Sequence, residues 1–305
     1  MPIRFRNLSP ALQAQMILAN YGMMISPNAN IFYVDSGHAA ASASGPGTNP
    51  KSPLSTIDAA VGKCDPDNGD MIIVMPGHAE VVASAGALDL DVAGITIIGI
   101  GQGASQPTVT FTTIITADMD VDAANVTVIG INFVAGFADI TAAIDVNADD
   151  FSVLGCRFTQ SAVDMNALIW VQDAAAGASD RIRIEGCHVI AYDAANTHFV
   201  NFGGTGDGHI VRRNVLLGDW GTACIGGAGV VTHVTVTDND IRNAATDNDS
   251  CIKFAATATG VCARNMAHGG AAQANGFTGQ NMSMNQNYYG VVNEDLSGIL
   301  EPIVT

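Results

Sequence analysis

The chain has 305 residues, of which 48% are apolar and only 6% are aromatic. Acidic residues outnumber basic ones 29 to 12, and the formal net charge of −17 argues against nucleic acid or an anionic membrane as a partner. No apolar stretch approaches the roughly 18 residues that a membrane-spanning helix needs. Neither nucleic-acid binding nor membrane insertion is therefore expected.

Residues 1–30 are predicted to form an N-terminal arm around one short helix at 9–22. Ser9 can cap this helix, because its side-chain oxygen can accept a hydrogen bond from a free N–H group of the first turn. Pro10 suits the first turn, where its missing N–H group leaves no bond unmade. The helix is short, so its stability depends on what it packs against.

The arm carries the residues that we expect to dock onto a partner. Leu12 and Met16 share one face of the predicted helix, and Arg4 and Arg6 precede it. The alternative is that this apolar face packs on the body of the same chain. The two arginines weakly resemble the start of a secretion signal, but polar residues interrupt the segment that follows, so no signal is expected.

Residues 31–80 are predicted to cap one end of the main body. They contain, in chain order, a strand at 31–35, a loop at 36–53, a helix at 55–64 and a strand at 71–77. Ser52 or Ser55 can cap the helix. Its apolar face consists of Ile57, Ala60 and Val61. Laid across the open end of a β-structure, such a helix prevents edge-to-edge association.

A short phrase recurs along the rest of the chain. It consists of an apolar-polar-apolar run, a small or turn residue, then Asn, Cys or Asp, and another apolar residue; two copies lie at 126–133 and 151–158. Aligned on the turn residue, the copies fall at 99, 130, 155, 186, 212, 238, 263 and 285. One such unit is too small to bury its own apolar face, so successive units must stack into a solenoid.

A second strand usually follows each copy of the phrase. Such strands are predicted at 143–146, 167–171, 198–202, 222–225 and 251–254. A strand, a turn, a strand, a loop and a further strand in about 25 residues per coil predict an all-β parallel β-helix, here over 31–290, with a C-terminal tail at 291–305. Leucine-rich repeats have a similar length, but they need Leu where this chain has Val and Ile.

Cysteine and asparagine fall at recurring positions of the phrase. Cys156 and Cys187 share one position in neighbouring coils, and Cys224 and Cys251 form a similar pair, so we expect stacked, buried, reduced thiols. Reduced thiols are typical of synthesis in the cytosol. A turn-stabilising ladder is predicted for Asn132, Asn214, Asn239, Asn265 and Asn287.

The N-terminal cap also carries a recognisable pattern. Tyr33-Val34-Asp35, a Gly-rich loop, the segment 49–57 and the segment 69–80, with its Gly-Asp, strand and Pro-Gly, follow one another. This pattern resembles the N-terminal part of right-handed, single-stranded parallel β-helix proteins of the pectate-lyase-like superfamily. The resemblance implies that fold and specifies function weakly, since the superfamily includes polysaccharide-active enzymes, secreted repeat proteins and many bacteriophage tailspikes and virion proteins.

The resemblance directs the search for a catalytic site to carboxylates on one exposed sheet. Asp145 and Asp173 lie in adjacent predicted coils beside Trp170, and Asp164 lies in an intervening turn. If the chain is an enzyme, these carboxylates are its catalytic candidates, and the indole of Trp170 is a platform for a glycan. The alternative is that they are solvated residues of an acidic surface, and no catalytic residue is then assigned.

No metal ligand set is assigned, and no cofactor is expected. Asp118, Asp120 and Asp122 alternate along one strand face and could hold calcium, although the alternative is an exposed edge. A Gly- and Asp-containing segment at 203–208 occurs only once, so it is interpreted as a loop. The histidines have no metal-ligand spacing.

The leading hypothesis is a non-enzymatic structural protein of a tailed bacteriophage virion, either a capsid decoration or a tail-associated β-helix. It implies other virion proteins as partners, such as the major capsid protein, a homotrimer, and a location in the virion after assembly in the host cytoplasm. The alternative is a polysaccharide lyase or glycoside hydrolase of the tailspike type, acting on an acidic or bacterial surface glycan. A third hypothesis is a secreted adhesin or surface-layer module.

Overall fold

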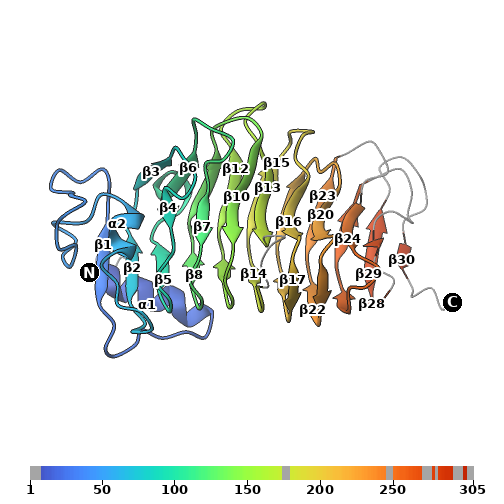
Figure 1. Cartoon of the computed structure of the whole chain (residues 1–305), viewed down its shortest axis with the longest axis horizontal. Coiled ribbons are helices and arrows are strands. Elements are labelled where there is room, and N and C mark those ends of the chain that lie inside the picture. Colours follow the sequence, from blue (N-terminus) through green and yellow to red (C-terminus); the bar gives the residue numbers. More distant parts are fainter. Residues whose placement is uncertain are drawn as a thin grey trace, which may run out of the picture.

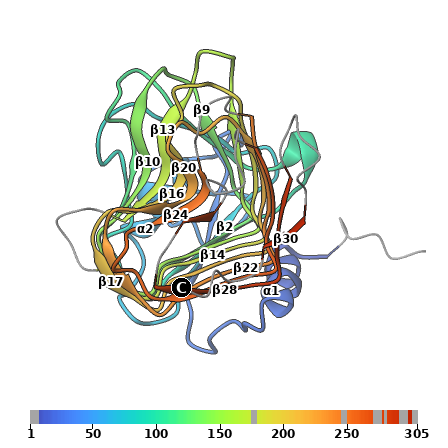
Figure 2. The same cartoon turned by 90° about the vertical axis from the view of Figure 1, so that its right-hand side faces the viewer.

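A computed structural model describes residues 8–173, 179–244, 250–269, 277–278, 281–290 and 298–300. Within these ranges the chain is a right-handed parallel β-helix, as the sequence predicts. Successive coils stack along the long axis, and the α-helices α1 and α2 lie at the N-terminal end (Figure 1). Seen from the end, three sheets surround one continuous apolar core (Figure 2).

The chain visits the three sheets in turn. Sheet 1 contains β1 (Ile31–Val34), β2 (Met71–Val74), β5 (Thr96–Gly99), β8 (Thr127–Ile129), β11 (Ser152–Leu154), β14 (Arg183–Glu185), β18 (Ile210–Arg212), β22 (Val234–Thr237), β25 (Gly260–Ala263) and β28 (Met282–Asn285). Sheet 2 contains β3 (Ala79–Val82), β6 (Thr108–Phe111), β9 (Asn132–Ala135), β12 (Arg157–Gln160), β15 (His188–Ala191), β19 (Val215–Gly218), β23 (Asp240–Asn243), β26 (Met266–His268), β29 (Asn287–Gly290) and β30 (Gly298–Leu300).

Sheet 3 is shorter, and one small pair of strands lies beside it in the coil. Sheet 3 contains β4 (Leu88–Asp89), β7 (Met119–Val121), β10 (Ile140–Val146), β13 (Ala167–Asp173), β16 (His198–Phe202), β20 (Ala223–Gly227), β24 (Ser250–Phe254) and β27 (Phe277–Thr278). The small pair is β17 (Thr205–Asp207) with β21 (Val230–Thr232). Neighbouring strands are parallel except β30, which runs antiparallel to β29.

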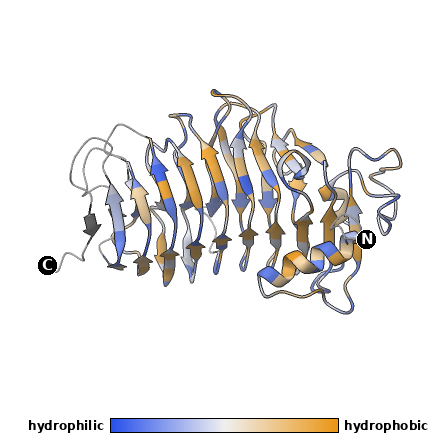
Figure 3. Cartoon of the chain, turned by 180° about the vertical axis from the view of Figure 1, so that it is seen from behind, coloured by the Kyte–Doolittle hydropathy of each residue, from blue (hydrophilic) through white to orange (hydrophobic). Residues whose placement is uncertain are grey.

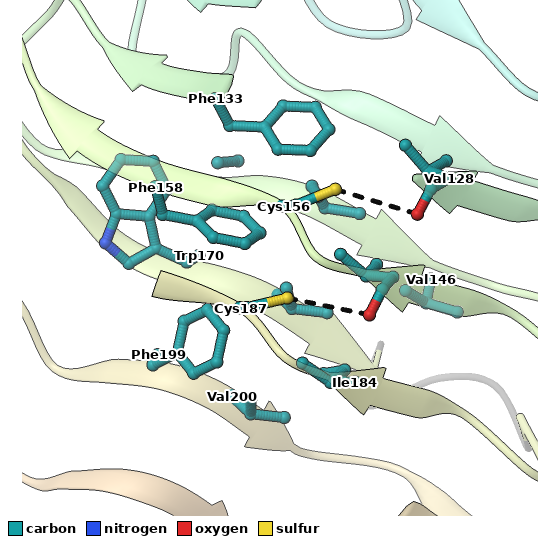
Figure 4. Packing of buried hydrophobic residues seen from close by; sticks show 14 of the residues in the cluster. Val128, Phe133, Val146, Cys156, Phe158, Trp170, Ile184, Cys187, Phe199 and Val200 are labelled. Carbon is teal, nitrogen blue, oxygen red and sulfur yellow. Dashed lines mark hydrogen bonds between the residues drawn. The ribbon is translucent and has the colours of Figure 1, made fainter. Parts of the chain in front are cut away.

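Aromatic rings stack in the middle of the core. Phe133 and Phe158 lie in adjacent coils with ring centroids 5.2 Å apart, and Phe199 meets Phe158 edge-on at the same distance (Figure 4). Trp170 also packs edge-on against Phe158 and is fully buried. Trp170 is therefore a core residue, and its predicted role as an outward glycan platform is wrong. Burial along β13 does not alternate strictly, because Trp170 and its neighbour Val171 are both buried.

The corner between sheets 1 and 2 is one tight turn in the left-handed backbone region. Gly130, Gly155 and Gly186 adopt it first, and Arg213, Asp238, Arg264 and Gln286 follow in later coils. The predicted turn positions 212, 263 and 285 are therefore one residue too early. In these three coils neither the predicted nor the observed turn residue is a glycine, so no glycine marks the left-handed position in the sequence.

Directly after this corner runs an inward column of polar side chains. Asn214, Asn239, Asn265 and Asn287 form a buried ladder in which each amide donates to the next one at 2.9–3.0 Å. Cys156 and Cys187 occupy the same column in earlier coils. Asn132 lies one register position later and is half-buried on the outer side of β9, so its predicted place in the ladder is wrong.

All six cysteines are buried and free, as predicted. Cys156 and Cys187 each have a backbone carbonyl as a hydrogen-bond acceptor, Val128 O at 3.7 Å and Val153 O at 3.7 Å. Burial raises the pKa of Cys156 to about 12. A thiol held in this way is a small core residue rather than a nucleophile.

The N-terminal end is closed by α2 (Ile57–Val61), whose apolar face is buried as predicted. Its cap is Thr56, whose Oγ1 accepts from the Ala59 N–H at 3.2 Å, so the predicted caps Ser52 and Ser55 are wrong. Glu80 accepts the Ile57 N–H at 2.9 Å, and His78 Nε2 lies 3.0 Å from the same carboxylate.

The predicted N-terminal helix is α1 (Pro10–Asn20), capped by Ser9. It packs along the outer side of sheet 1 through Ala14 and Leu18, which are buried against the strands below (Figure 3). No helix in the described ranges is both long and apolar enough to cross a membrane.

Candidate functional site

A row of carboxylates runs along the outer side of sheet 3. Asp89, Asp120 and Asp145 are direct neighbours in the registers of β4, β7 and β10. Burial, together with the charges of neighbouring aspartates, raises the pKa of Asp120 to about 6. Burial also raises the pKa values of Asp89 and Asp145, with added repulsion from nearby aspartates. Crowded carboxylates near neutral pKa can act as proton donors, which glycoside hydrolysis requires.

Asp120 of this row is one of the three residues that the sequence offered for calcium, together with Asp118 and Asp122 of the same coil. Asp118 accepts the Gly86 N–H at 2.7 Å, so part of its charge is already bonded. Among the residues with assigned positions, no three His, Cys, Asp or Glu side chains converge on a common metal position. Calcium at Asp118, Asp120 and Asp122 therefore stays a prediction.

The predicted catalytic carboxylates are not brought to one place. Asp145 lies opposite Gln172 of the next coil, while Asp173 lies one position further and is 1% exposed. Burial, with the charges of Asp145 and Asp180, raises the pKa of Asp173 to about 7. Asp164 is exposed in the loop between β12 and β13. Only Asp145 belongs to the acidic row.

A second feature is a groove on the outer side of sheet 2, with a cavity volume of about 530 Å³. Its lining residues are Gly103, Gln106, Asn132, Arg157, Thr159, Gln160, Ala162, Val163, Ile190 and Tyr192. The strands β9, β12 and β15 supply the floor, and loops supply the two rims. Sites for small ligands typically enclose about 300–1,000 Å³, so the groove has the size of a ligand site.

The sequence did not single out the groove, although a signal for it exists. The turn positions 99 and 130 are 31 residues apart, whereas 130 and 155 are 25 apart. The longer coil contains an insertion at the corner between sheets 1 and 2, where a 3-10 helix, η2 (Gly103–Ser105), forms one rim. Uneven intervals between coils thus mark where a solenoid carries extra loops.

The predicted docking residues divide between described and undescribed parts of the chain. Arg4 and Arg6 lie outside the described residues. Leu12 and Met16 are 47% and 46% exposed on the side of α1 that faces away from sheet 1. The helix therefore packs on its own chain, and it does so through a different face from the one predicted for docking.

The strand order defines the class of this protein as a parallel β-helix. No family model and no curated protein sequence matches the chain. Among solved structures, the crystal structure of pectate lyase Pel9A is similar, with a TM-score of 0.36 and 11% identity over 84% of this chain and 79% of that chain. So distant a likeness carries no argument about activity beyond what the strand order shows.

Proposed function

We propose that the chain is a non-enzymatic structural protein of a tailed bacteriophage virion, a capsid decoration or tail-associated rod held through its N-terminal segment. The observation that carries the proposal is the position of α1. Ala14 and Leu18 fix the helix on the outer side of sheet 1, while Leu12 and Met16 point away from it. A helix held rigidly with an unpaired apolar face is suited to binding another protein.

The partner in this proposal is another virion protein, such as the major capsid protein, and the chain forms a homotrimer assembled in the host cytoplasm. Covering two half-exposed apolar side chains contributes on the order of 1–3 kcal/mol to association. In a trimer three such contacts act together, and this avidity makes the attachment more stable than one weak contact would.

The test is incorporation into particles. Tailed phage particles produced from a genome that carries this sequence are purified, and the chain is detected by mass spectrometry. The double variant Leu12→Asp/Met16→Asp is expected to fold, to be expressed and to be lost from the particles. The matched control Val230→Asp changes an apolar side chain of similar exposure on β21 and is expected to be retained. Absence of the native chain from particles, or retention of the double variant, rejects the proposal.

A second candidate is a polysaccharide hydrolase or lyase, and the acidic row on sheet 3 is the observation that favours it. Asp120, with a pKa of about 6, is suited to protonating a leaving group, and Asp89 and Asp145 flank it. Release of reducing sugar from a panel of bacterial capsules and acidic glycans, abolished by Asp120→Asn and by Asp145→Asn, would favour this candidate over the first.

A further inference from the structure

We propose that an arginine cluster on the outer side of sheet 1 binds an acidic segment of the partner protein that α1 contacts. The cluster consists of Arg183, Arg212 and Arg213, which surround Glu185. The inference rests on the proposed docking through α1, and it adds the chemistry of the partner, which presents carboxylates next to apolar side chains. The groove on sheet 2 and the acidic row on sheet 3 take no part in it.

The cluster begins where α1 ends. In one column of outward positions, the residues of the first five strands of sheet 1 are apolar, and α1 packs on them. They are Tyr33, Ile73, Ile98, Ile129 and Leu154. The next two residues of the same column are Glu185 and Arg212. Tyr21, at the C-terminal end of α1, has its hydroxyl against Gly155, one coil before Glu185. The outer side of sheet 1 therefore changes from apolar to charged at the end of the helix.

One buried carboxylate holds the three guanidinium groups together. Glu185 Oε2 accepts from Arg183 Nε at 2.9 Å and lies 3.0 Å from Arg212 Nη2. Its Oε1 accepts from Arg213 Nη1 at 3.1 Å. Burial alone would raise the pKa of Glu185, but hydrogen bonds and charge from Arg183 and Arg212 lower it, so the carboxylate is ionised at neutral pH. Three positive charges and one negative charge leave the cluster with an excess of two positive charges.

Glu185 does not saturate the cluster. The side chain of Arg213 is 65% exposed, and a guanidinium group has five N–H donors in all. The Nε of Arg212 is buried and has no hydrogen-bond partner among the residues that the structure describes. The arginines therefore present both charge and free donors to an incoming carboxylate, which a guanidinium group can bind through two parallel hydrogen bonds.

This excess of positive charge is unusual in a chain with a net charge of −17. Arg181 shows the opposite arrangement, because carboxylates surround it at 2.7–3.4 Å. They belong to Asp149, Asp150 and Asp180. At physiological ionic strength, charges more than about 8 Å apart are largely screened. A short acidic segment at the cluster meets mainly the excess positive charge, whereas a long polyanion such as nucleic acid also meets the acidic surface around it.

The neighbouring helix favours a protein segment over a small anion. Leu12 and Met16 are about half exposed on α1. Covering them requires apolar side chains, which a phosphate ion lacks. A protein segment supplies both apolar side chains for the helix and carboxylates for the arginines. The partner surface that fits is thus an apolar patch with at least two acidic residues beside it.

The test is isothermal titration calorimetry of the full chain with two peptides of equal length, hexaglutamate and hexaglutamine. At physiological ionic strength we expect hexaglutamate to bind with a Kd of about 1 mM or tighter, and hexaglutamine at least tenfold more weakly. Raising the NaCl concentration to about 0.5 M should weaken the binding of hexaglutamate severalfold, because salt screens the charges. Inorganic phosphate and a single-stranded thymidine hexanucleotide should each bind at least tenfold more weakly than hexaglutamate.

Variants locate the binding site. The double variant Arg212→Gln/Arg213→Gln removes the two excess charges and should weaken the binding of hexaglutamate at least tenfold. It leaves Glu185 with both of its hydrogen bonds from Arg183, so it is expected to fold. Arg213→Gln alone changes a mostly exposed side chain and should weaken binding about threefold or more. Arg181→Gln is the matched control, because Arg181 has the same left-handed backbone as Arg213 but is surrounded by carboxylates, and it should bind like the native chain.

Four results would overturn the proposal. They are no binding of hexaglutamate, equal binding of hexaglutamine, equal or tighter binding of phosphate or the hexanucleotide, and unchanged binding by both arginine variants when their circular dichroism spectra and melting temperatures match those of the native chain. The particle assay on Leu12→Asp/Met16→Asp keeps the two proposals apart. Retention of that variant rejects docking through α1 even if hexaglutamate binds the cluster, whereas its loss without hexaglutamate binding rejects only the acidic partner.

Discussion

The asparagine ladder gives the sharpest quantitative prediction of this structure. Asn239 is 2% exposed, and its side chain makes four hydrogen bonds. Its Nδ2 donates to Val211 O at 3.1 Å and to Asn265 Oδ1 at 2.9 Å. Its Oδ1 accepts from the backbone N–H of Asn214 at 3.1 Å and from Asn214 Nδ2 at 2.9 Å. The change Asn239→Ala removes all four bonds in one coil.

The expected cost follows from the number of bonds and from what they leave behind. Each net hydrogen bond contributes about 0.5–1.5 kcal/mol, so four bonds give roughly 2–6 kcal/mol. The change also strands two donors of Asn214 in a buried column, which places the expected loss of unfolding free energy near 4 kcal/mol. Unfolding of the variant should begin in the coils on either side of Asn239, because each coil of a solenoid contacts only its neighbours.

Asn132→Ala is the matched control, because the same residue type stands one register position away. Asn132 is half-buried and accepts one side-chain bond, from Thr159 at 3.3 Å, so its removal should cost less than about 1 kcal/mol. Urea unfolding followed by far-ultraviolet circular dichroism gives the two free energies. If the two variants differ from each other by less than about 1 kcal/mol, the ladder does not stabilise the fold as argued.

Two further predictions concern titratable groups. Burial and neighbouring charges raise the pKa of Asp120 to about 6, above the value of about 3.9 in the unfolded chain. Between these two pKa values the folded state holds a proton on Asp120 that the unfolded state has lost. The free energy of unfolding therefore falls as the pH rises from about 4 to 6. Asp120→Asn should therefore raise the free energy of unfolding at pH 8 by about 1 kcal/mol, after allowance for solvent screening, and should not raise it at pH 4. The control Asp164→Asn, in an exposed loop, should leave the free energy of unfolding unchanged at both pH values. An Asp120→Asn variant that is only as stable as the native chain at pH 8 contradicts this prediction. Since all six cysteines are buried, iodoacetamide at pH 8 should label none of them in the folded protein and all of them in denaturant. The intact mass of the chain measures the number of labels. Rapid labelling of Cys156 or Cys187 without denaturant would show that their coil opens.

The fold was predictable because its signal is periodic. Each coil repeats the same inward positions, so the phrase around 126–133 and 151–158 reports the stacking directly. The predicted second strand at 198–202 coincides with β16, and the strand at 167–171 is extended by two residues in β13. The stacked thiols and four of the five predicted ladder members follow from the same alignment.

The corner positions show where this reasoning loses precision. Gly130, Gly155 and Gly186 mark the left-handed residue openly, since glycine adopts positive φ at no steric cost. Arg213 and Arg264 adopt the same conformation with no such mark. The ladder and the core on either side fix the register of the chain, and this outweighs the small strain of the two arginines. The conformational preferences of single residues do not include that constraint on the register.

The outward positions were harder to predict, because nothing periodic constrains them. Trp170 was assigned to the outer side of a strand predicted at 167–171. In the structure, Trp170 and Val171 are both buried, so strict alternation fails within β13.

The separation of roles in this fold explains why the candidate sites came from loops and outer rows. The inward columns are occupied by the ladder, the thiols and the stacked rings, so a change there costs stability. An outward residue such as Arg157 is bound by no such requirement, and the inserted residues at 103–105 raise a rim beside it without disturbing the stack. A solenoid can therefore carry a rim beside an outer groove by lengthening one coil, and the 31-residue interval from 99 to 130 marks such a longer coil in this chain.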